Sequence, residues 1–182
     1  MKVIATGLRG LVLLEPVVHG DERGFLVETY RVDELAAAGI STEFVQENQS
    51  RSRRGTLRGM HFQVGRGQAK LIRVSRGAVL DVVVDIRRSS PTFGRHQAVE
   101  LDDVGHRQLY VPVGFAHGFY VTSDIADVSY KLDAPYDPTA ERGIAWDDPA
   151  LAIAWPDSDP ILSDRDRAQP RLADIESDLP AW

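Results

Sequence analysis

The 182-residue sequence contains no cysteine, and this absence removes several classes of chemistry. A protein without cysteine has no disulfide framework, no thiolate nucleophile and no thiolate metal site. The sequence also lacks an apolar run of the roughly 20 residues that span a membrane, and its N-terminus lacks the layout of a signal peptide. It has no glycine-rich dinucleotide fingerprint, so nothing predicts NAD binding. We therefore expect a soluble, cytoplasmic protein.

The charge, composition and length of the chain indicate which functions to expect and how many domains it forms. The formal net charge is −6, which argues against nucleic-acid binding as the main function, although arginines between residues 51 and 58 form a local basic cluster. Apolar residues make up 43% of the chain, enough for a sizeable core. The length suits one domain that spans 1–182. The tail, 157–182, is rich in Asp, Pro and Arg, but its aliphatic residues predict that it packs as an extension of that domain.

The dominant periodicity is two, which is typical of β-strands. The segment 78–86 is apolar except at Asp81 and Asp85, whose spacing places both carboxylates on one face. Turn signals recur roughly every ten residues and favour an all-β sandwich or small barrel. Helix signals are few, at 33–38 and after Ser163. The predicted strands are 11–15, 25–30, 44–48, 70–75, 78–86, 97–101, 108–111, 117–122 and 126–132.

The first candidate site lies in Leu57–Gln63 and shortly after it. Arg58 and His61 are three residues apart, with a glycine between them that permits close backbone approach. Lys70 opens the next predicted strand. A base, an anion-binding group and a cation suit the removal of a proton from carbon beside a carbonyl. Each residue alone also fits a structural role, as a buried histidine, a surface arginine or an edge-strand lysine.

A second histidine, His117, ends a Pro-x-Gly-x-x-His segment that begins at Pro112 and resembles the second half of the cupin motif. The first half of that motif places His-x-His, followed by Glu, where this sequence has His61-Phe62-Gln63. Two histidines without further ligands make a weak metal site. We therefore expect a cupin barrel in which acid–base chemistry replaces the metal. A buried histidine bonded to the backbone is the alternative.

Two tyrosines and an acidic segment complete the candidates. A tyrosine held against a carbanion centre can act as a general acid, and Tyr130 and Tyr136 are candidates, although packing in the core or at its rim is the simpler role. An aspartate far along the chain can orient a histidine, and Asp164 and Asp166 both fit. Ser163 and Asp164 also suit a helix N-cap.

Many segments match one known pattern in order along the chain. They are Asp21–Phe25 with Glu28, Phe44–Asn48 with Ser50, Gly55–Gln63, Lys70, Asp81–Asp85, Ser89–Gly94, Gly114–Phe119, Tyr130, Tyr136–Pro138, Trp155–Pro156 and Leu162–Asp166. Together they resemble the dTDP-4-dehydrorhamnose 3,5-epimerase family. The resemblance runs from about residue 8 to about residue 170, so it covers nearly the whole chain and is more specific than any single motif.

The resemblance implies a cupin-like jelly roll with a few short peripheral helices, which forms a homodimer with strands exchanged between subunits and needs no metal or other cofactor. The implied substrate is a dTDP-linked 4-keto-6-deoxy sugar, and the implied reaction inverts C3 and C5. In this reading His61 is the base and Asp166 orients it. Lys70 stabilises the enolate, and Tyr130 is the acid on the opposite face.

The resemblance also implies a set of binding residues. His117 and Asp81 would line the sugar pocket or contact the residues that line it, and Tyr136 would contact the substrate. The expected nucleotide and diphosphate contacts, some of them supplied by the partner subunit, are Arg23, Phe25, Glu28, Gln46, Asn48 and Arg58.

Three other functions use the same residues. A 3- or 5-monoepimerase of antibiotic-sugar biosynthesis would need the same base, acid and enolate stabiliser. A metal-dependent cupin enzyme would need a third and a fourth ligand. A non-catalytic module that binds sugar nucleotides would need the pocket without the base.

Overall fold

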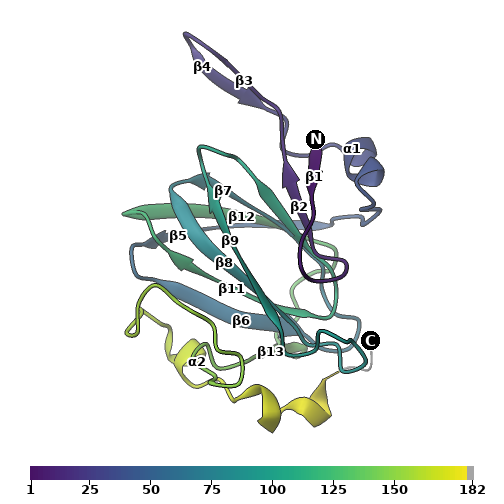
Figure 1. Cartoon of the computed structure of the whole chain (residues 1–182), viewed down its shortest axis with the longest axis vertical. Coiled ribbons are helices and arrows are strands. Elements are labelled where there is room, and N and C mark those ends of the chain that lie inside the picture. The colour runs from purple at the N-terminus through teal and green to yellow at the C-terminus, as the bar shows by residue number, and fades with distance from the viewer. Residues whose placement is uncertain (180–182) are drawn as a thin grey trace.

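The computed structural model describes residues 1–179 and consists mainly of two facing antiparallel β-sheets, the arrangement of a cupin-like jelly roll (Figure 1). This confirms the predicted all-β class. The six-stranded sheet has the order β1 (Lys2–Ile4), β2 (Val12–Glu15), β10 (Gln108–Val111), β7 (Lys70–Arg76), β12 (Ile125–Leu132) and β5 (Gln46–Arg53). The five-stranded sheet has the order β13 (Glu141–Gly143), β6 (Leu57–Gln63), β11 (Phe115–Val121), β8 (Ala78–Asp85) and β9 (His96–Asp102).

The main core lies between the two sheets and contains side chains from both. In β8, Val79 and Val83 point into this core, whereas Val82 and Val84 belong to a second cluster on the outer face of the same sheet. All four are fully buried, which explains why this strand is apolar on both faces. Burial of each such side chain contributes about 1.5–3 kcal/mol to folding.

Short helices and the C-terminal segment cover the outer faces of the sheets. Helix α1 (Val32–Ala37) packs Leu35 against the outer face of the six-stranded sheet. The segment after β13 crosses the outer face of the five-stranded sheet and contributes Leu151 and Leu172 to its apolar cluster (Figure 1). It contains α2 (Asp164–Arg167) and two 3-10 turns, η1 (Leu172–Asp174) and η2 (Glu176–Asp178). The last three residues of the tail lie outside the described part of the chain.

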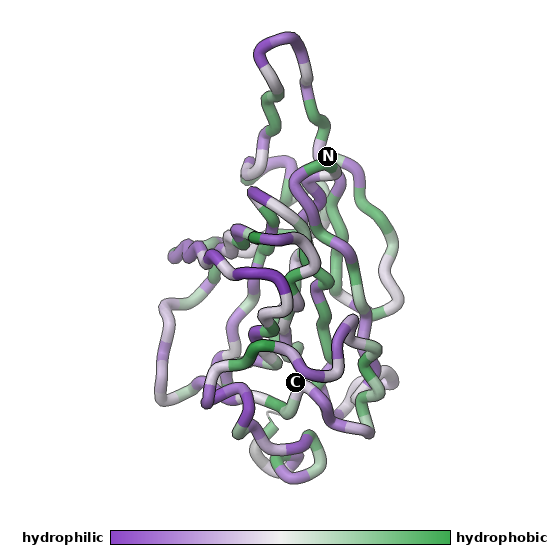
Figure 2. The backbone as a smooth tube through the Cα atoms, turned by 90° about the vertical axis from the view of Figure 1, so that its left-hand side faces the viewer, coloured by the Kyte–Doolittle hydropathy of each residue, from purple (hydrophilic) through white to green (hydrophobic). Residues whose placement is uncertain are grey.

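A two-stranded hairpin, β3 (Val18–Asp21) and β4 (Gly24–Val27), projects from the body of the protein (Figures 1 and 2). Its apolar side chains are unusually exposed to solvent, at 61% for Phe25 and 72% for Leu26. These two successive residues of β4 point to opposite faces of the hairpin, so both of its faces expose a large apolar side chain. No helix within residues 1–179 is long and apolar enough to cross a membrane.

The predicted and observed strands differ in their bounds and in number. Strand β5 begins at Gln46 rather than at residue 44 and continues to Arg53, and β4 ends at Val27 rather than at residue 30. The strands β1, β3, β6 and β13 were not predicted. The even-numbered side chains of β5 face inward and its odd-numbered ones face solvent, yet nearly all are polar. A hydrophobic alternation therefore cannot reveal this strand.

Candidate active site

A cavity of about 410 Å³ opens between the two sheets, within the range of small-molecule sites. Its walls come from β5, β6, β7, β11, β12, β13, the loop before β13 and helix α2. Its lining residues are Asn48, Ser50, Arg58, His61, Phe62, Gln63, Gln68, Lys70, His117, Phe119, Tyr130, Leu132, Tyr136, Glu141, Ser163, Arg165 and Asp166.

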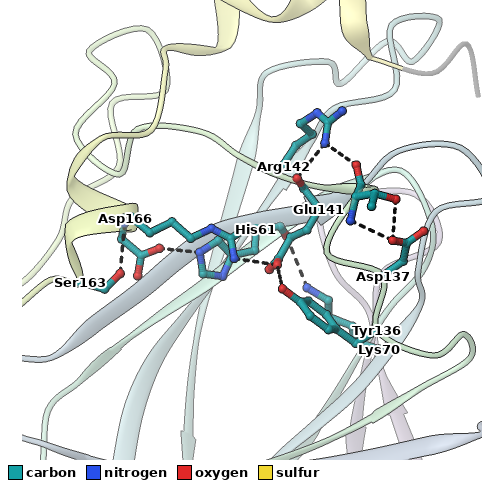
Figure 3. Close-up of polar contacts among 10 residues, drawn as sticks. His61, Lys70, Tyr136, Asp137, Glu141, Arg142, Ser163 and Asp166 are labelled. Carbon is teal, nitrogen blue, oxygen red and sulfur yellow. Dashed lines mark hydrogen bonds and ion pairs between the residues drawn. The ribbon is translucent and has the colours of Figure 1, made fainter.

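His61 and Asp166 form the most distinctive pair in this cavity (Figure 3). The Nε2 atom of His61 lies 2.6 Å from Oδ1 of Asp166. Ser163 caps α2 by accepting a hydrogen bond from the backbone N–H of Asp166, which fixes the turn that carries the carboxylate. Burial alone would raise the pKa of Asp166, but the hydrogen bond and charge of His61, together with hydrogen bonds from Ser163 and the backbone of Gly59, outweigh it, and the pKa lies below its ordinary value. Asp166 is therefore ionised at neutral pH.

A bulge in β6 brings Arg58 and His61 to the same cavity. His61 pairs with His117 of β11, and Arg58 pairs with Phe119, so β6 carries one extra residue between these pairs. Without the bulge, a spacing of three would place the two side chains on opposite faces. The backbones approach closely here, because a Cβ built on Gly59 would lie 2.5 Å from the Cα of the facing glycine.

The second histidine forms a second carboxylate pair, deeper in the protein. The Nε2 atom of His117 lies 2.8 Å from Oδ2 of Asp81. Asp81 is fully buried and does not line the cavity. Burial lowers the pKa of His117, and the nearby Asp81 offsets this only in part. The imidazole is therefore neutral near pH 7, and it donates its Nε2–H to Asp81.

Lys70 begins β7 and places its ammonium group beside the first histidine. Its Nζ atom lies 3.4 Å from the backbone carbonyl oxygen of His61. Burial lowers the pKa of Lys70 to about 8, although the carboxylates of Glu141 and Asp81 act in the opposite direction. The group is still mostly charged at pH 7, and it is partly desolvated, which strengthens its interaction with a developing negative charge.

The two tyrosines lie on different walls. Tyr130 lies within β12, and Tyr136 lies in the loop that follows this strand. The hydroxyl of Tyr136 donates to Oε2 of Glu141 at 2.5 Å, and Arg165 donates to the same oxygen at 2.7 Å (Figure 3). Sequence reasoning did not single out Glu141, because a glutamate in a three-residue strand has no periodic or motif signal.

The expected nucleotide-binding residues divide into two groups. Asn48 and Arg58 line the cavity, and Ser52 accepts a hydrogen bond from Nε of Arg58 at 3.0 Å. Gln46 does not line the cavity, and both of its amide atoms bond to other residues. Within a single chain the structure also does not bring Arg23, Phe25 or Glu28 into the cavity. They lie on the projecting hairpin or just after it.

The two histidine–carboxylate pairs do not combine into one metal site. Within residues 1–179, no group of three or more His, Asp or Glu side chains is arranged to hold a metal ion. Each histidine instead has its Nε2 atom engaged by its own carboxylate. The arrangement suits proton transfer, with an ionised carboxylate behind an imidazole and a cation beside it.

The family model described as dTDP-4-dehydrorhamnose 3,5-epimerase matches residues 5–174. The chain belongs to this family. A dTDP-4-dehydrorhamnose 3,5-epimerase from Pseudomonas aeruginosa is 45% identical over 178 residues, which cover 97% of this chain and 98% of that relative. A dTDP-4-dehydrorhamnose 3-epimerase from Streptomyces niveus is 43% identical over 176 residues, which cover 96% of this chain and 85% of the relative.

The solved structures of this epimerase family agree with the fold. A crystal structure of dTDP-6-deoxy-D-glucose-3,5-epimerase from Legionella pneumophila Philadelphia 1, in complex with dTDP-4-keto-L-rhamnose, matches with a TM-score of 0.96 and 44% identity. The match covers 100% of this chain and 98% of that one. The cupin-like jelly roll predicted from the resemblance is thereby confirmed.

Proposed function

We propose that this protein converts dTDP-4-dehydro-6-deoxy-D-glucose to dTDP-4-dehydro-L-rhamnose by inverting C3 and C5, as a step of dTDP-L-rhamnose biosynthesis. The observation that carries the proposal is the His61–Asp166 pair in a cavity that also holds Lys70 and Tyr130. Membership of the epimerase family supports it.

The proposed chemistry follows from the C4 ketone of the substrate. The protons at C3 and C5 are acidic because the ketone oxygen can hold the charge as an enolate. Since Nε2–H of His61 donates to Asp166, Nδ1 carries the free lone pair and takes the proton from carbon. Lys70 stabilises the enolate oxygen, and Tyr130 returns a proton from the opposite face. Each inversion breaks one C–H bond and forms another, and it leaves His61 protonated and Tyr130 deprotonated, so proton exchange with solvent restores both groups before the next inversion.

Arg58, on this proposal, binds the diphosphate of the substrate. Its Nε is already bonded to Ser52, which leaves its terminal nitrogens to donate to phosphate oxygens. His117 is held by Asp81 next to the sugar pocket, and the Tyr136 hydroxyl, with Glu141 and Arg165, forms part of the rim. The catalytic roles use no cofactor.

The proposed assembly is a homodimer in which the β3–β4 hairpin of each subunit completes the cavity of the other. The hairpin exposes apolar side chains such as Leu26, and three of the four expected nucleotide contacts that lie outside the cavity of their own chain are on it or adjacent to it. A partner hairpin that supplies Arg23, Phe25 and Glu28 would account for both facts. We place the enzyme in the cytoplasm, as expected from its sequence.

A 3-monoepimerase is the second candidate, because the similar protein from Streptomyces niveus carries that name. Incubation of the enzyme with dTDP-4-keto-6-deoxyglucose in D₂O separates the two activities. Double epimerisation predicts deuterium at both C3 and C5, measured by NMR of the recovered sugar nucleotide. Label at one carbon only would replace the proposal by a monoepimerase.

The His61→Ala variant is the control for this exchange experiment. It should still bind dTDP but should label neither carbon at a measurable rate, because a general base contributes on the order of 10²–10⁴-fold to the rate and the other cavity histidine, His117, is bonded to the buried Asp81. Turnover by this variant at the wild-type rate would contradict the assignment of His61 and favour a different proton acceptor.

A further inference from the structure

Gln46 has both atoms of its side-chain amide committed to neighbouring residues. Its Oε1 atom accepts a hydrogen bond from the backbone N–H of Tyr136 at 2.9 Å. Its Nε2 atom donates to Oδ1 of Asn48 at 3.0 Å. The family resemblance implies that Gln46 contacts the nucleotide or the diphosphate, and in the structure its side chain connects β5 to the loop that carries Tyr136.

This short chain of hydrogen bonds fixes the direction of two amide groups. A backbone N–H can only donate, so the Gln46 oxygen must face Tyr136 and its NH₂ group must face Asn48. Asn48 must then present its oxygen to Gln46, which turns its own NH₂ group away from Gln46. Asn48 lines the cavity, and we infer that Gln46 is a positioning residue that makes Asn48 a hydrogen-bond donor to the ligand.

The position of Asn48 in the sheet indicates where this donor acts. Asn48 and Tyr130 are directly paired across β5 and β12, and both line the cavity. Gln46 and Asn48 have the same parity in β5 and share its inward face. The Asn48 donor therefore lies beside the proposed acid, where it meets an acceptor oxygen of the bound sugar nucleotide.

The inference deepens the proposed function and rests on it for the identity of the ligand, but the direction of the amides does not depend on any ligand. A Gln46→Glu substitution isolates the effect. Its carboxylate still accepts from the Tyr136 N–H but offers no donor to Asn48. Asn48 can then form a hydrogen bond to this carboxylate only if its amide rotates, which turns its NH₂ group towards the carboxylate and its oxygen towards the cavity. The fold is kept and the donor is lost.

The first experiment follows the side-chain NH₂ signals of Asn48 by ¹H–¹⁵N NMR in the ligand-free protein, with Asn48→Ala to assign them. In the wild type we expect these protons to exchange readily with solvent. In Gln46→Glu we expect them to shift downfield and to exchange more slowly, because they become bonded to a carboxylate. Unchanged Asn48 signals in the variant would overturn the inference, whether or not the protein binds a nucleotide.

The second experiment measures the Kd of dTDP and the KM and kcat for the sugar nucleotide. Gln46→Glu and Asn48→Ala should each weaken binding roughly 10- to 100-fold, with a much smaller effect on kcat, because a ligand acceptor loses its donor. The double variant should bind no more weakly than Asn48→Ala alone. Additive losses would show that Gln46 does not act through Asn48.

Gln49→Glu is the matched control, because it makes the same change of charge on the exposed face of the same strand. It should leave the Asn48 signals and the dTDP affinity at wild-type values. A wild-type protein that fails to bind dTDP would contradict the proposed function, and the NMR result would still decide the direction of the amides.

Discussion

At the scale of single residues, the burial of Lys70 has two opposing effects on catalysis. The partly desolvated ammonium stabilises charge well, but burial lowers its pKa to about 8. Because the role needs the charged form, kcat/KM should fall as the pH rises through about 8. Lys70→Arg should lower the rate but move this loss to higher pH, since guanidinium stays charged. The pH profiles of both enzymes, measured from pH 6 to pH 10, test this.

The outcome that would contradict this role of Lys70 is specific. A wild-type profile that stays flat beyond pH 9, or a Lys70→Arg profile with an unshifted alkaline limb, would mean that another group controls the limb. Retained binding of dTDP by the variant, measured by calorimetry, would show that the cavity itself is intact.

The carboxylate behind His61 is the second test at this scale. Asp166→Asn should keep the geometry but lower kcat on the order of 10²–10⁴-fold, because the amide no longer stabilises the imidazolium that forms during proton removal. Asp164→Asn is the control, since Asp164 lies in the same helix but is exposed to solvent. Equal losses in the two variants would indicate damage to the helix rather than loss of a charge partner.

The sequence predicted eight of the seventeen cavity-lining residues but not how they combine. It could not distinguish Asp164 from Asp166 without the family resemblance, because only the turn capped by Ser163 decides which carboxylate points back to His61. It also missed Glu141, whose contacts come from two separate segments of the chain. Side chains that meet only through tertiary packing leave no local pattern in a sequence.

At the scale of elements, the buried end of β8 is held by Asp85. This carboxylate is fully buried and accepts hydrogen bonds from Arg87 at 2.8 and 2.7 Å, from Ser90 at 2.7 Å and from Thr92 at 2.6 Å. Burial would raise the pKa of Asp85, but these bonds outweigh it and hold the value at about 2. The carboxylate thus ties β8 to the turn that precedes β9.

Stability should depend on the ionised form of Asp85. Because its folded pKa lies below the ordinary value of 3.8, its contribution is present above pH 4 and is lost as the pH falls towards 2. That contribution is about 2 kcal/mol. Asp85→Asn should therefore lower the free energy of unfolding at pH 7, and its difference from the wild type should shrink below pH 4. Urea melts across this pH range measure both effects.

An exposed ion pair provides the comparison for Asp85. Asp124 is 94% exposed and pairs with Arg54, so Asp124→Asn should change the free energy of unfolding by less than about 1 kcal/mol. If Asp85→Asn were equally mild at pH 7, the network at the end of β8 would be irrelevant to stability.

A strand can be predicted from its hydrophobic pattern only if it buries apolar side chains. Strands such as β8 and β12 bury apolar side chains, and their pattern reveals them. Strand β5 exposes one polar face to solvent and lines a polar cavity with the other, and β6 is interrupted by Gly59 at its bulge. Two of the strands that line the cavity, β5 and β6, therefore have the weakest strand signal, whereas β7, β11 and β12 were predicted.

At the scale of the whole molecule, the hairpin predicts complementation between two inactive variants. Mixed dimers of His61→Ala and Arg23→Ala subunits contain one cavity that combines an intact His61 with an intact partner hairpin. If Arg23 acts across the dimer, an equilibrated mixture should recover roughly a quarter of wild-type activity, given random pairing and one restored cavity in each mixed dimer.

The complementation assay needs only the two purified variants, mixed under conditions that allow subunit exchange. Each variant alone, treated in the same way, is the control. If Arg23 served the cavity of its own chain, both cavities of the mixed dimer would stay defective and mixing would restore nothing. Sedimentation of the wild type as a monomer would contradict the dimer itself.

The position of Asp166 along the chain has a consequence for biosynthesis. Asp166 is contributed by α2, after the last strand, whereas His61 belongs to β6. The ribosome releases the chain from its N-terminus, so every strand of the barrel emerges before the carboxylate that His61 needs. A nascent chain that has not yet released α2, or a chain that terminates before it, therefore contains every strand but lacks the carboxylate half of the proton-transfer pair.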